Sequence, residues 1–369
     1  MENKERVYLD LHAIQTVPPS CVNRDDTGSP KTAVYGGVRR ARVSSQSWKR
    51  AMRLMFAEHF KEKELGQRTK KVVDMVAEEI KKMDNSIDNA KAIELAEKVL
   101  GACGLGLKKE KGKEIAEASA LFFLGRQQAK NLAKLILDGT DDSEKELVKK
   151  AKEAIVANQA VDIALFGRMV ANDPSLNADA SAQVAHSIST HRVDNEYDYF
   201  TAVDDLAPKD NAGAGMIGVV EYNSATLYRY ATVAVHELNR ELGNETDVTS
   251  KAVIEFIRAF ITSMPTGKQN TFANRTLPDA VLITLRKDQP INFAGAFEKP
   301  VQDKGNGYVQ ESVQRLEHYA TKVYETFATK PDKAWTIGIE DDLADTEKVS
   351  LEQLLQVVAT DISAELSGK

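Results

Sequence analysis

Apolar residues alternate along the first segment of the chain and recur at helical spacing in a later one. Residues 6–17 (RVYLDLHAIQTV) alternate apolar and β-favouring residues up to a pair of prolines, which predicts a strand followed by a loop. The loop at 18–43 is longer than most loops inside folded domains, so we expect it to be functional. Ser44 or Ser45 can then cap a helix that continues to about Phe60.

The rest of the chain separates into a helical block and a second set of strands and helices. Residues 70–158 have helical spacing and strong helix formers, which predicts a helical insertion. From 159 to 235 β-like runs return, and a polar, glycine-containing stretch at 194–223 predicts a protruding hairpin. A helix at about 248–263 and a strand at 280–286 follow. Without the insertion, this is a βαββαβ outline, the ferredoxin-like arrangement of an α+β fold that RNA-recognition domains also use.

The composition is that of a soluble globular protein. The 369 residues are 42% hydrophobic and 28% charged, and no stretch approaches the ~18 consecutive apolar residues that a membrane span requires. The charged N-terminus is not a signal peptide, and Cys21 and Cys103 lie far apart without metal-ligand spacing. We therefore expect a cytoplasmic protein with reduced thiols, no membrane contact, no metal and no cofactor.

Basic charge is concentrated in one segment of an acidic chain. The formal net charge is −6, which taken alone argues against a nucleic-acid partner. Between Thr27 and Ala57, however, there are seven basic residues and no acidic one. This asymmetry indicates one binding face for an anionic partner. The seven residues are Lys31, Arg39, Arg40, Arg42, Lys49, Arg50 and Arg53.

The start of the predicted helix lacks the acidic residues that a first helical turn usually favours. Hydroxyl and amide groups at 44–47 surround the helix N-terminus instead, with Arg42 before them and Lys49 and Arg50 after them. Helical spacing places Gln46, Lys49, Arg50 and Arg53 opposite the apolar side. This combination predicts a phosphate site. The alternative is a solvated basic helix face without a ligand.

Several motifs resemble those of one protein family. The segments SCVNRDD (20–26) and YGGVRRARVSSQSWKRAMR (35–53) are similar to motifs of the RNA-binding backbone subunit of type I-E Cascade, the CasC family. The resemblance spans most of the chain and is weakest in the helical insertion and toward the C-terminus. It includes VDIALFGRM (161–169), AHSISTHRVD (185–194), FTAVDD (200–205), LYRYATV (227–233), PTGKQNTFA (265–273) and AFEKPV (296–301).

The resemblance implies a hand-like, non-catalytic subunit of a CRISPR surveillance complex in antiviral defence. Copies would stack along a CRISPR RNA whose guide bases pair with a target DNA strand, and other Cascade subunits would dock on them. The expected parts are a ferredoxin-like palm at 1–60, 159–193 and 224–300, helical fingers at 61–158, a β-hairpin thumb at 194–223, and C-terminal helices packed on the palm at 301–369.

The resemblance also implies candidate RNA contacts, to which the basic segment adds Arg40, Arg42 and Arg53. Phosphate contacts and stacking do not depend on base sequence, which suits a subunit that covers variable guides. The implied phosphate contacts are Arg24, Lys31, Ser44, Gln46, Lys49, Arg50, Lys268 and Gln269, and the positions near the base stack are Met169, Tyr199 and Phe200. Without the resemblance, the two aromatic residues would be interpreted as core residues.

Two pairs of acidic residues keep an enzymatic alternative open. Asp25-Asp26 and Asp204-Asp205 could hold Mg²⁺ for phosphodiester hydrolysis, as in a metal-dependent RNA endonuclease of the CRISPR ferredoxin-like superfamily. Adjacent carboxylates rarely reach the same ion, and acids beside arginines more often orient a guanidinium. A third interpretation is an assembly protein whose basic strip binds an acidic neighbour.

Other motifs are interpreted as structural. The glycines of 213–218 fit G-x-G-x-x-G but lack the strand-to-helix context of a dinucleotide site, so we expect a flexible hairpin tip. His186 and His191 are five residues apart on a strand-like segment, which predicts opposite faces and no shared metal.

Overall fold

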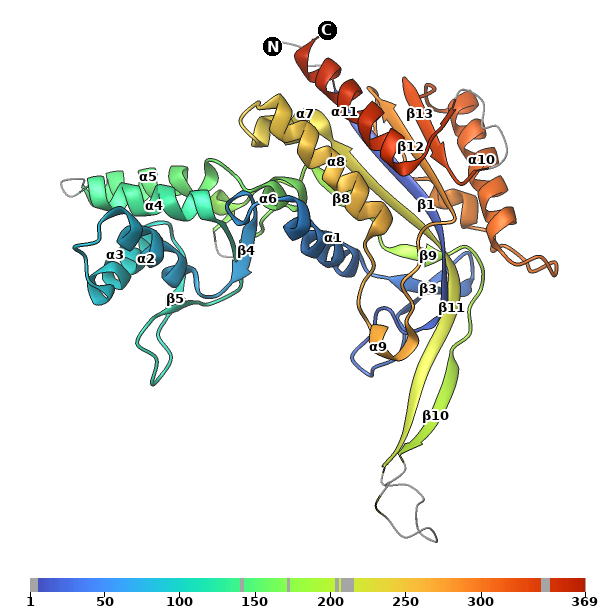
Figure 1. The fold of residues 1–369 in the computed structure, drawn as a ribbon, viewed down its shortest axis with the longest axis horizontal. Coiled ribbons are helices and arrows are strands. Elements are labelled where there is room, and N and C mark those ends of the chain that lie inside the picture. The colour runs from blue at the N-terminus through green and yellow to red at the C-terminus, as the bar shows by residue number, and fades with distance from the viewer. Residues whose placement is uncertain are drawn as a thin grey trace. The chain divides into compact units, whose positions relative to one another are not determined.

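The computed structural model has the mixed α+β architecture that the sequence predicts, and its contacts divide the chain into two compact units (Figure 1). It describes residues 6–139, 143–170, 173–202, 206, 216–339 and 346–368. Unit 1 comprises Met1–Leu54, Val184–Thr232 and Phe256–Thr360, and unit 2 comprises Met55–Gln183, Val233–Glu255 and Asp361–Lys369.

A large sheet forms the centre of unit 1 (Figure 1). Strand β1 pairs antiparallel with β12, from Tyr8 opposite Arg286 to Ile14 opposite Ala280. Two further strands, β8 (Ala182–Val184) and β10 (Glu196–Ala202), pair with β11. In spatial order the remaining strands are β14 (Glu347–Lys348), β13 (Lys333–Ile337), β12 (Ala280–Arg286), β1 (Tyr8–Ser20), β11 (Met216–Ala234), β9 (Ser187–Ser189), β3 (Val38–Val43) and β2 (Thr32–Tyr35).

Helix α10 (Val309–Thr326) packs in an apolar cluster of unit 1. Its Leu316 and Ala320 are buried with Ile14 of β1 and Leu282 of β12. The 3-10 segment η4 (Phe293–Phe297) adds two phenylalanines to this cluster. Because these positions come from distant parts of the sequence, burial of this cluster holds the sheet and α10 together.

Helix α1 (Ser45–His59) begins where the sequence predicts, directly after Ser44. The Ser44 Oγ accepts a hydrogen bond from the Ser47 N–H at 3.4 Å, as an N-cap does. Trp48 is buried in another apolar cluster, with Val17 and Val43 among its members, and its indole N–H donates to the Ser187 Oγ at 2.9 Å. The Arg229 guanidinium lies 3.7 Å from the centre of the Trp48 ring. These contacts fix the start of α1 against β9 and β11.

The order of elements in the sheet and its helices follows the predicted outline. With α8 (Thr246–Thr262) included, the chain runs β1, α1, β9, β11, α8, β12. The predicted helix at 248–263 and strand at 280–286 are therefore confirmed to within two residues. Within 301–369, where C-terminal helices are expected, the structure has α10 and α11 (Leu351–Ser367). Between them the structure adds β13 and β14, which the sequence analysis did not predict.

The predicted loop at 18–43 is partly regular, which corrects that prediction. Strand β1 continues through the two prolines to Ser20, and β2 and β3 form a hairpin. Gly36 and Gly37 turn this hairpin with φ angles of 59° and 77°. Two-residue hairpin turns of this kind need positive φ at both positions, which glycine adopts without steric cost.

Unit 2 contains a helical core of its own. Val76, Ala96, Leu132 and Ile155 are fully buried together, one from each of four helices. Two small strand pairs that the sequence analysis missed accompany them, β4 (Gly66–Thr69) with β7 (Phe122–Gly125) and β5 (Leu107–Lys108) with β6 (Glu117–Ala118). The four helices are α2 (Val72–Met83), α3 (Asn89–Ala102), α4 (Arg126–Asp138) and α5 (Glu144–Val156), and α6 (Val161–Phe166) and α7 (Val235–Glu241) also belong to this unit.

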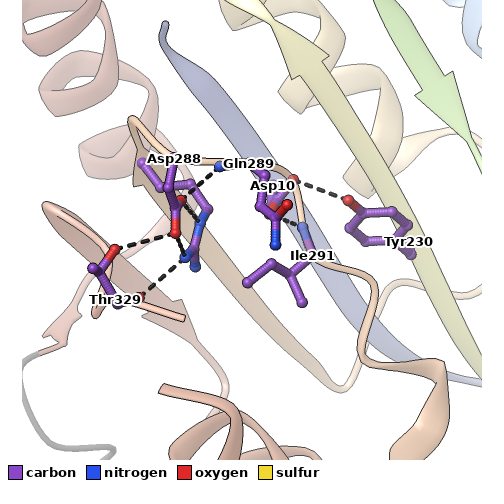
Figure 2. A network of polar contacts seen from close by, with 7 residues as sticks. Asp10, Tyr230, Asp288, Gln289, Ile291 and Thr329 are labelled. Carbon is purple, nitrogen blue, oxygen red and sulfur yellow. Dashed lines mark hydrogen bonds and ion pairs between the residues drawn. The ribbon is translucent and has the colours of Figure 1, made fainter. Parts of the chain in front are cut away.

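A polar network joins residues on and next to strands β1, β11 and β12 in the sheet of unit 1 (Figure 2). The Asp10 carboxylate accepts hydrogen bonds from the Tyr230 hydroxyl at 3.0 Å and from the Ile291 N–H at 2.8 Å. Arg286 donates from Nε and Nη2 to the two oxygens of Asp288, both at 2.7 Å. Burial raises the pKa of Asp10 to about 6, while the hydrogen bond from Arg286 lowers the pKa of Asp288 to about 2.

No helix within the described ranges is long and apolar enough to cross a membrane.

Candidate nucleic-acid interface

The loop that follows β1 is held by its own side chains. The Asp25 Oδ1 accepts hydrogen bonds from the Thr27 N–H at 3.0 Å, the Thr27 hydroxyl at 2.7 Å and the Ser29 N–H at 3.0 Å. These bonds, the one from the Thr27 hydroxyl first, lower the pKa of Asp25. We expected acids beside arginines to orient a guanidinium, but the hydrogen bonds of Asp25 are made within its own loop, next to the exposed Arg24.

Asn23 connects this loop to the start of α1. Its carbonyl accepts from the Lys31 N–H at 2.8 Å, and its side-chain Oδ1 accepts from the Ser44 N–H at 2.9 Å. The sequence analysis did not single out Asn23, although the asparagine next to Arg24 in SCVNRDD was visible. Its two bonds bring the backbone of Lys31 next to the helix N-cap.

A second loop, at 265–268, lies directly on the first. A Cβ atom at Gly267 would come within 2.0 Å of the Val22 carbonyl oxygen, so only glycine permits this approach. The next residue, Lys268, has a φ of 50° and precedes the short helix α9 (Gln269–Phe272). Burial raises the pKa of the Cys21 thiol, and the positive charges of Arg24 and Lys268 both oppose that rise. The two predicted cations, Arg24 and Lys268, therefore both lie close enough to Cys21 to influence its thiol.

Lys31, Arg42 and His186 gather at the N-terminal end of α1. The His186 Nδ1 accepts a hydrogen bond from the Ser45 N–H at 3.2 Å and lies 3.5 Å from the Arg42 Nη1. Burial lowers the pKa of His186, and the charges of Arg42 and Lys31 lower it further. Beside them is a cavity of about 20 Å³, lined in part by Asn23, Lys31 and Arg42, which has room for a single water.

The outer side of α1 carries the other predicted residues of the helix start. Gln46 and Arg50 are exposed, whereas Lys49 and Arg53 are half-buried. Burial lowers the pKa of Lys49. Within the described part of the chain, the following cations form no ion pair with a carboxylate: Arg24, Lys31, Arg42, Arg50 and Lys268. We call these five residues the basic surface.

Arg40 does not belong to the basic surface, which corrects the prediction that it contacts RNA. It is fully buried, and its guanidinium donates to the carbonyl oxygens of Ser189 and Phe297, both at 2.8 Å. Two further carbonyls, of Tyr35 and Glu298, accept from it at 3.2 Å. The prediction placed Arg40 in a loop, but it lies in β3, where Ser189 of β9 and the segment at Phe297 and Glu298 cover its side chain.

The candidate stacking residues are on the surfaces of both units. Tyr199 and Phe200 belong to β10, which forms with β11 a hairpin that projects from the sheet of unit 1 (Figure 1). They are 62% and 37% exposed, so neither is a core aromatic. The ring of Phe200 covers Gly218, where a Cβ would lie 2.4 Å from the ring. Met169 belongs to unit 2 and is 85% exposed.

Among the residues that the structure describes, no cluster of three or more His, Cys, Asp or Glu could hold a metal ion. Asp204, Asp205 and the glycines at 213 and 215 lie outside the described residues. His191, interpreted as structural, is buried, stacks on Tyr308 at 3.7 Å and accepts at Nε2 from the Thr226 N–H.

Comparison with known proteins identifies the family. The family model described as "CT1975-like protein" matches residues 9–360. The chain belongs to this family. It is the type I-E CasC family that the motifs resemble, so that prediction is confirmed. A search of curated proteins found no match.

Two solved structures are similar to this CasC-family chain over nearly its whole length. One, titled "CRISPR RNA-guided surveillance complex, pre-nicking", shares 34% sequence identity and has a TM-score of 0.82, with 96% of this chain and 100% of that chain covered. Another, titled "CRISPR RNA-guided surveillance complex", shares 30% identity with a TM-score of 0.62, and the coverage is 96% and 99%.

Proposed function

We propose that this CasC-family protein is a non-catalytic backbone subunit of a type I-E CRISPR surveillance complex and that its copies polymerise along CRISPR RNA. The basic surface is the observation that carries this proposal. Arg42 and Arg50 flank a helix start without acidic residues, and the loop of Arg24 and Lys31 is joined to that start through Asn23. Lys268 follows the loop that packs on Val22. None of the five pairs with a carboxylate of the described chain. Phosphates would satisfy these cations, and an RNA backbone supplies phosphates at regular spacing.

The architecture supports the same proposal. The order β1, α1, β9, β11, α8, β12 fits a ferredoxin-like palm, and the helical core of unit 2 fits the fingers. The β10–β11 hairpin fits the thumb, which would lie over the RNA of a neighbouring copy. Fingers and thumb would contact neighbouring copies, and further surfaces would dock the other Cascade subunits.

The division of labour between phosphates and bases follows from the residue types. Lysine and arginine bind phosphates without reading sequence, and exposed Tyr199, Phe200 and Met169 offer apolar or aromatic contacts that accept any base. The guide bases would then pair with the target DNA strand, so that base pairing and not the protein reads the sequence.

Native mass spectrometry of protein expressed with CRISPR RNAs of two lengths tests the polymerisation. We expect more copies per RNA on the longer guide, because each copy covers a fixed length of strand. Protein expressed without a CRISPR RNA is the control. A copy number that does not change with RNA length would contradict the proposal.

A further inference from the structure

His186 occupies an unusual position for a residue that the sequence analysis interpreted as structural. It precedes β9 and is exposed, and it meets the start of α1 from the side of the sheet. The pairing of β9 with β3, with Val43 opposite Ser187, fixes the backbone next to it. The bond from the Trp48 indole to the Ser187 Oγ fixes α1 on the same segment. The pairing and this hydrogen bond therefore fix the segment that carries the imidazole next to the start of α1.

The hydrogen bonds of His186 determine where its proton lies. Nδ1 accepts from the Ser45 N–H, so the neutral ring carries its proton on Nε2 and can donate there. In this state Nδ1 takes the place at the helix N-terminus that an anion would occupy. The ring thus has one nitrogen on the helix start and one nitrogen available to a ligand.

We propose that His186 is a proton-linked RNA contact, which donates from Nε2 to a phosphate of the strand bound on the basic surface and takes up a proton as the RNA binds. The inference rests on the proposed function and adds to it a pH dependence of RNA binding.

The positive charges around His186 couple its protonation to RNA binding. The charged groups that act on it are Lys31 from the loop before β2 and Arg42 from β3, and the positive end of α1 faces it through the Ser45 N–H. All of them disfavour a second proton in the free protein. A bound phosphate reverses this, because a negative charge near the ring favours imidazolium. Protonation of Nδ1 also removes an acceptor from the Ser45 N–H, which can then donate to a phosphate oxygen.

Linkage gives the sign of the effect. The RNA-bound protein binds the proton more tightly than the free protein, so the affinity for RNA rises as the pH falls through the pKa of His186 in the complex. Each pH unit by which RNA binding raises the pKa of His186 corresponds to an affinity about tenfold higher at acidic pH, where the ring is protonated, than at alkaline pH. Uridine-rich RNA is the suitable probe, because neither its bases nor its phosphodiesters titrate in the pH range in which histidine does.

The test measures the affinity of the full-length chain for a uridine-rich single-stranded RNA at constant ionic strength, from about pH 8 to about pH 5.5, the range in which histidine titrates. We expect the wild type to bind several-fold more tightly at the acidic end. His186→Gln keeps a neutral acceptor for Ser45 but cannot take up a proton, so its affinity for RNA should not rise as the pH falls. His318→Gln, on the exposed side of α10, is the matched control and should keep the gain.

The outcomes separate the inference from the proposed function. If His186→Gln gains affinity on acidification as the wild type does, the inference is overturned and RNA binding stands. If the wild type binds no RNA at any pH, the proposed function fails. Should the variant not fold, the His186 ring resonances of the wild type provide a second measurement by NMR. A pKa that RNA leaves unchanged overturns the inference, and a raised pKa supports it.

Discussion

Arg286 and Arg42 show two ways in which unit 1 holds a guanidinium. Arg286 is 1% exposed, donates to both oxygens of Asp288 and also donates to the Thr329 carbonyl at 3.0 Å (Figure 2). Arg42 is half-buried, and its neighbours are His186 and Lys31 rather than a carboxylate. One cation is neutralised by the chain itself, and the other is not.

The difference indicates which arginines serve the fold and which serve a ligand. A buried charge must be paired, as Arg286 is with Asp288, or fully hydrogen-bonded, as Arg40 is to backbone carbonyls, since one left without partners is strongly destabilising. An unpaired surface cation adds little to folding and repels cations beside it, so a cluster of them is useful only to an anionic partner. We therefore assign Arg286 to stability, and the basic surface remains our proposal for binding. Variants of Arg286 and of the basic surface separate the two roles.

The largest expected effect is on stability at the buried network. Arg286→Ala leaves Asp288 without its partner and removes a cation near buried Asp10, so we expect the free energy of unfolding to fall by about 3–5 kcal/mol. Urea denaturation measures the change. The RNA affinity of the folded variant should equal that of the wild type. A marked loss of affinity without a loss of stability would reverse the roles that we assign.

The next effect is a pH dependence of stability at Asp10. Its pKa is about 6 in the folded protein and close to 3.8 when unfolded, so between these values the folded chain holds a proton that the unfolded chain has lost. Stability from this group is therefore lost as the pH rises from about 4 to about 6. Asp10→Asn should match the wild type near pH 4 and exceed it by up to about 3 kcal/mol above pH 7. Equal urea midpoints at both pH values would contradict this.

A smaller energetic effect, on affinity alone, is expected at the basic surface. The double variant Lys31→Ala, Arg42→Ala should weaken RNA binding about tenfold and reduce the salt slope by ~0.7 for each phosphate that is no longer bound. Its free energy of unfolding should stay within about 0.5 kcal/mol of the wild type. Lys322→Ala, an exposed cation on α10, is the matched control. An unchanged salt slope would show that these cations do not bind phosphate.

The smallest effect is expected at Asp25. Asp25→Ala removes the acceptor that shapes the loop around Arg24, so RNA affinity should fall only a few-fold. Incubation of the wild type with labelled RNA and Mg²⁺ should give no cleavage. Cleavage that disappears in the variant would establish the endonuclease alternative.

Elements with a strong local pattern could be predicted from the sequence. Helix α1, the β10–β11 hairpin and strand β12 were predicted because periodicity, caps and glycines are visible within a few residues. The five-residue strand β13 has no such pattern and forms only through its pairing with β12. Local signals thus define elements, and long-range pairing completes the sheet.

The site could be predicted only in part for the same reason. The basic segment itself was visible as charge in the sequence. The burial of Arg40, by contrast, depends on the Ser189 carbonyl, 149 positions away, and the bond from Ser45 to His186 spans 141 positions. Neither contact leaves a sign in the local sequence, so Arg40 was wrongly assigned to the surface and His186 was not assigned to the site.

The close packing of Gly267 on the Val22 carbonyl joins segments that the ribosome synthesises at different times. The loop that carries Arg24 emerges early, but His186 and Lys268 are translated much later. Since contacts so far apart in sequence form only after the intervening chain is available, a nascent polypeptide lacks the complete cluster until most of it has been made. If the basic surface binds RNA as proposed, a growing chain presents the complete surface only once most of its fold has formed.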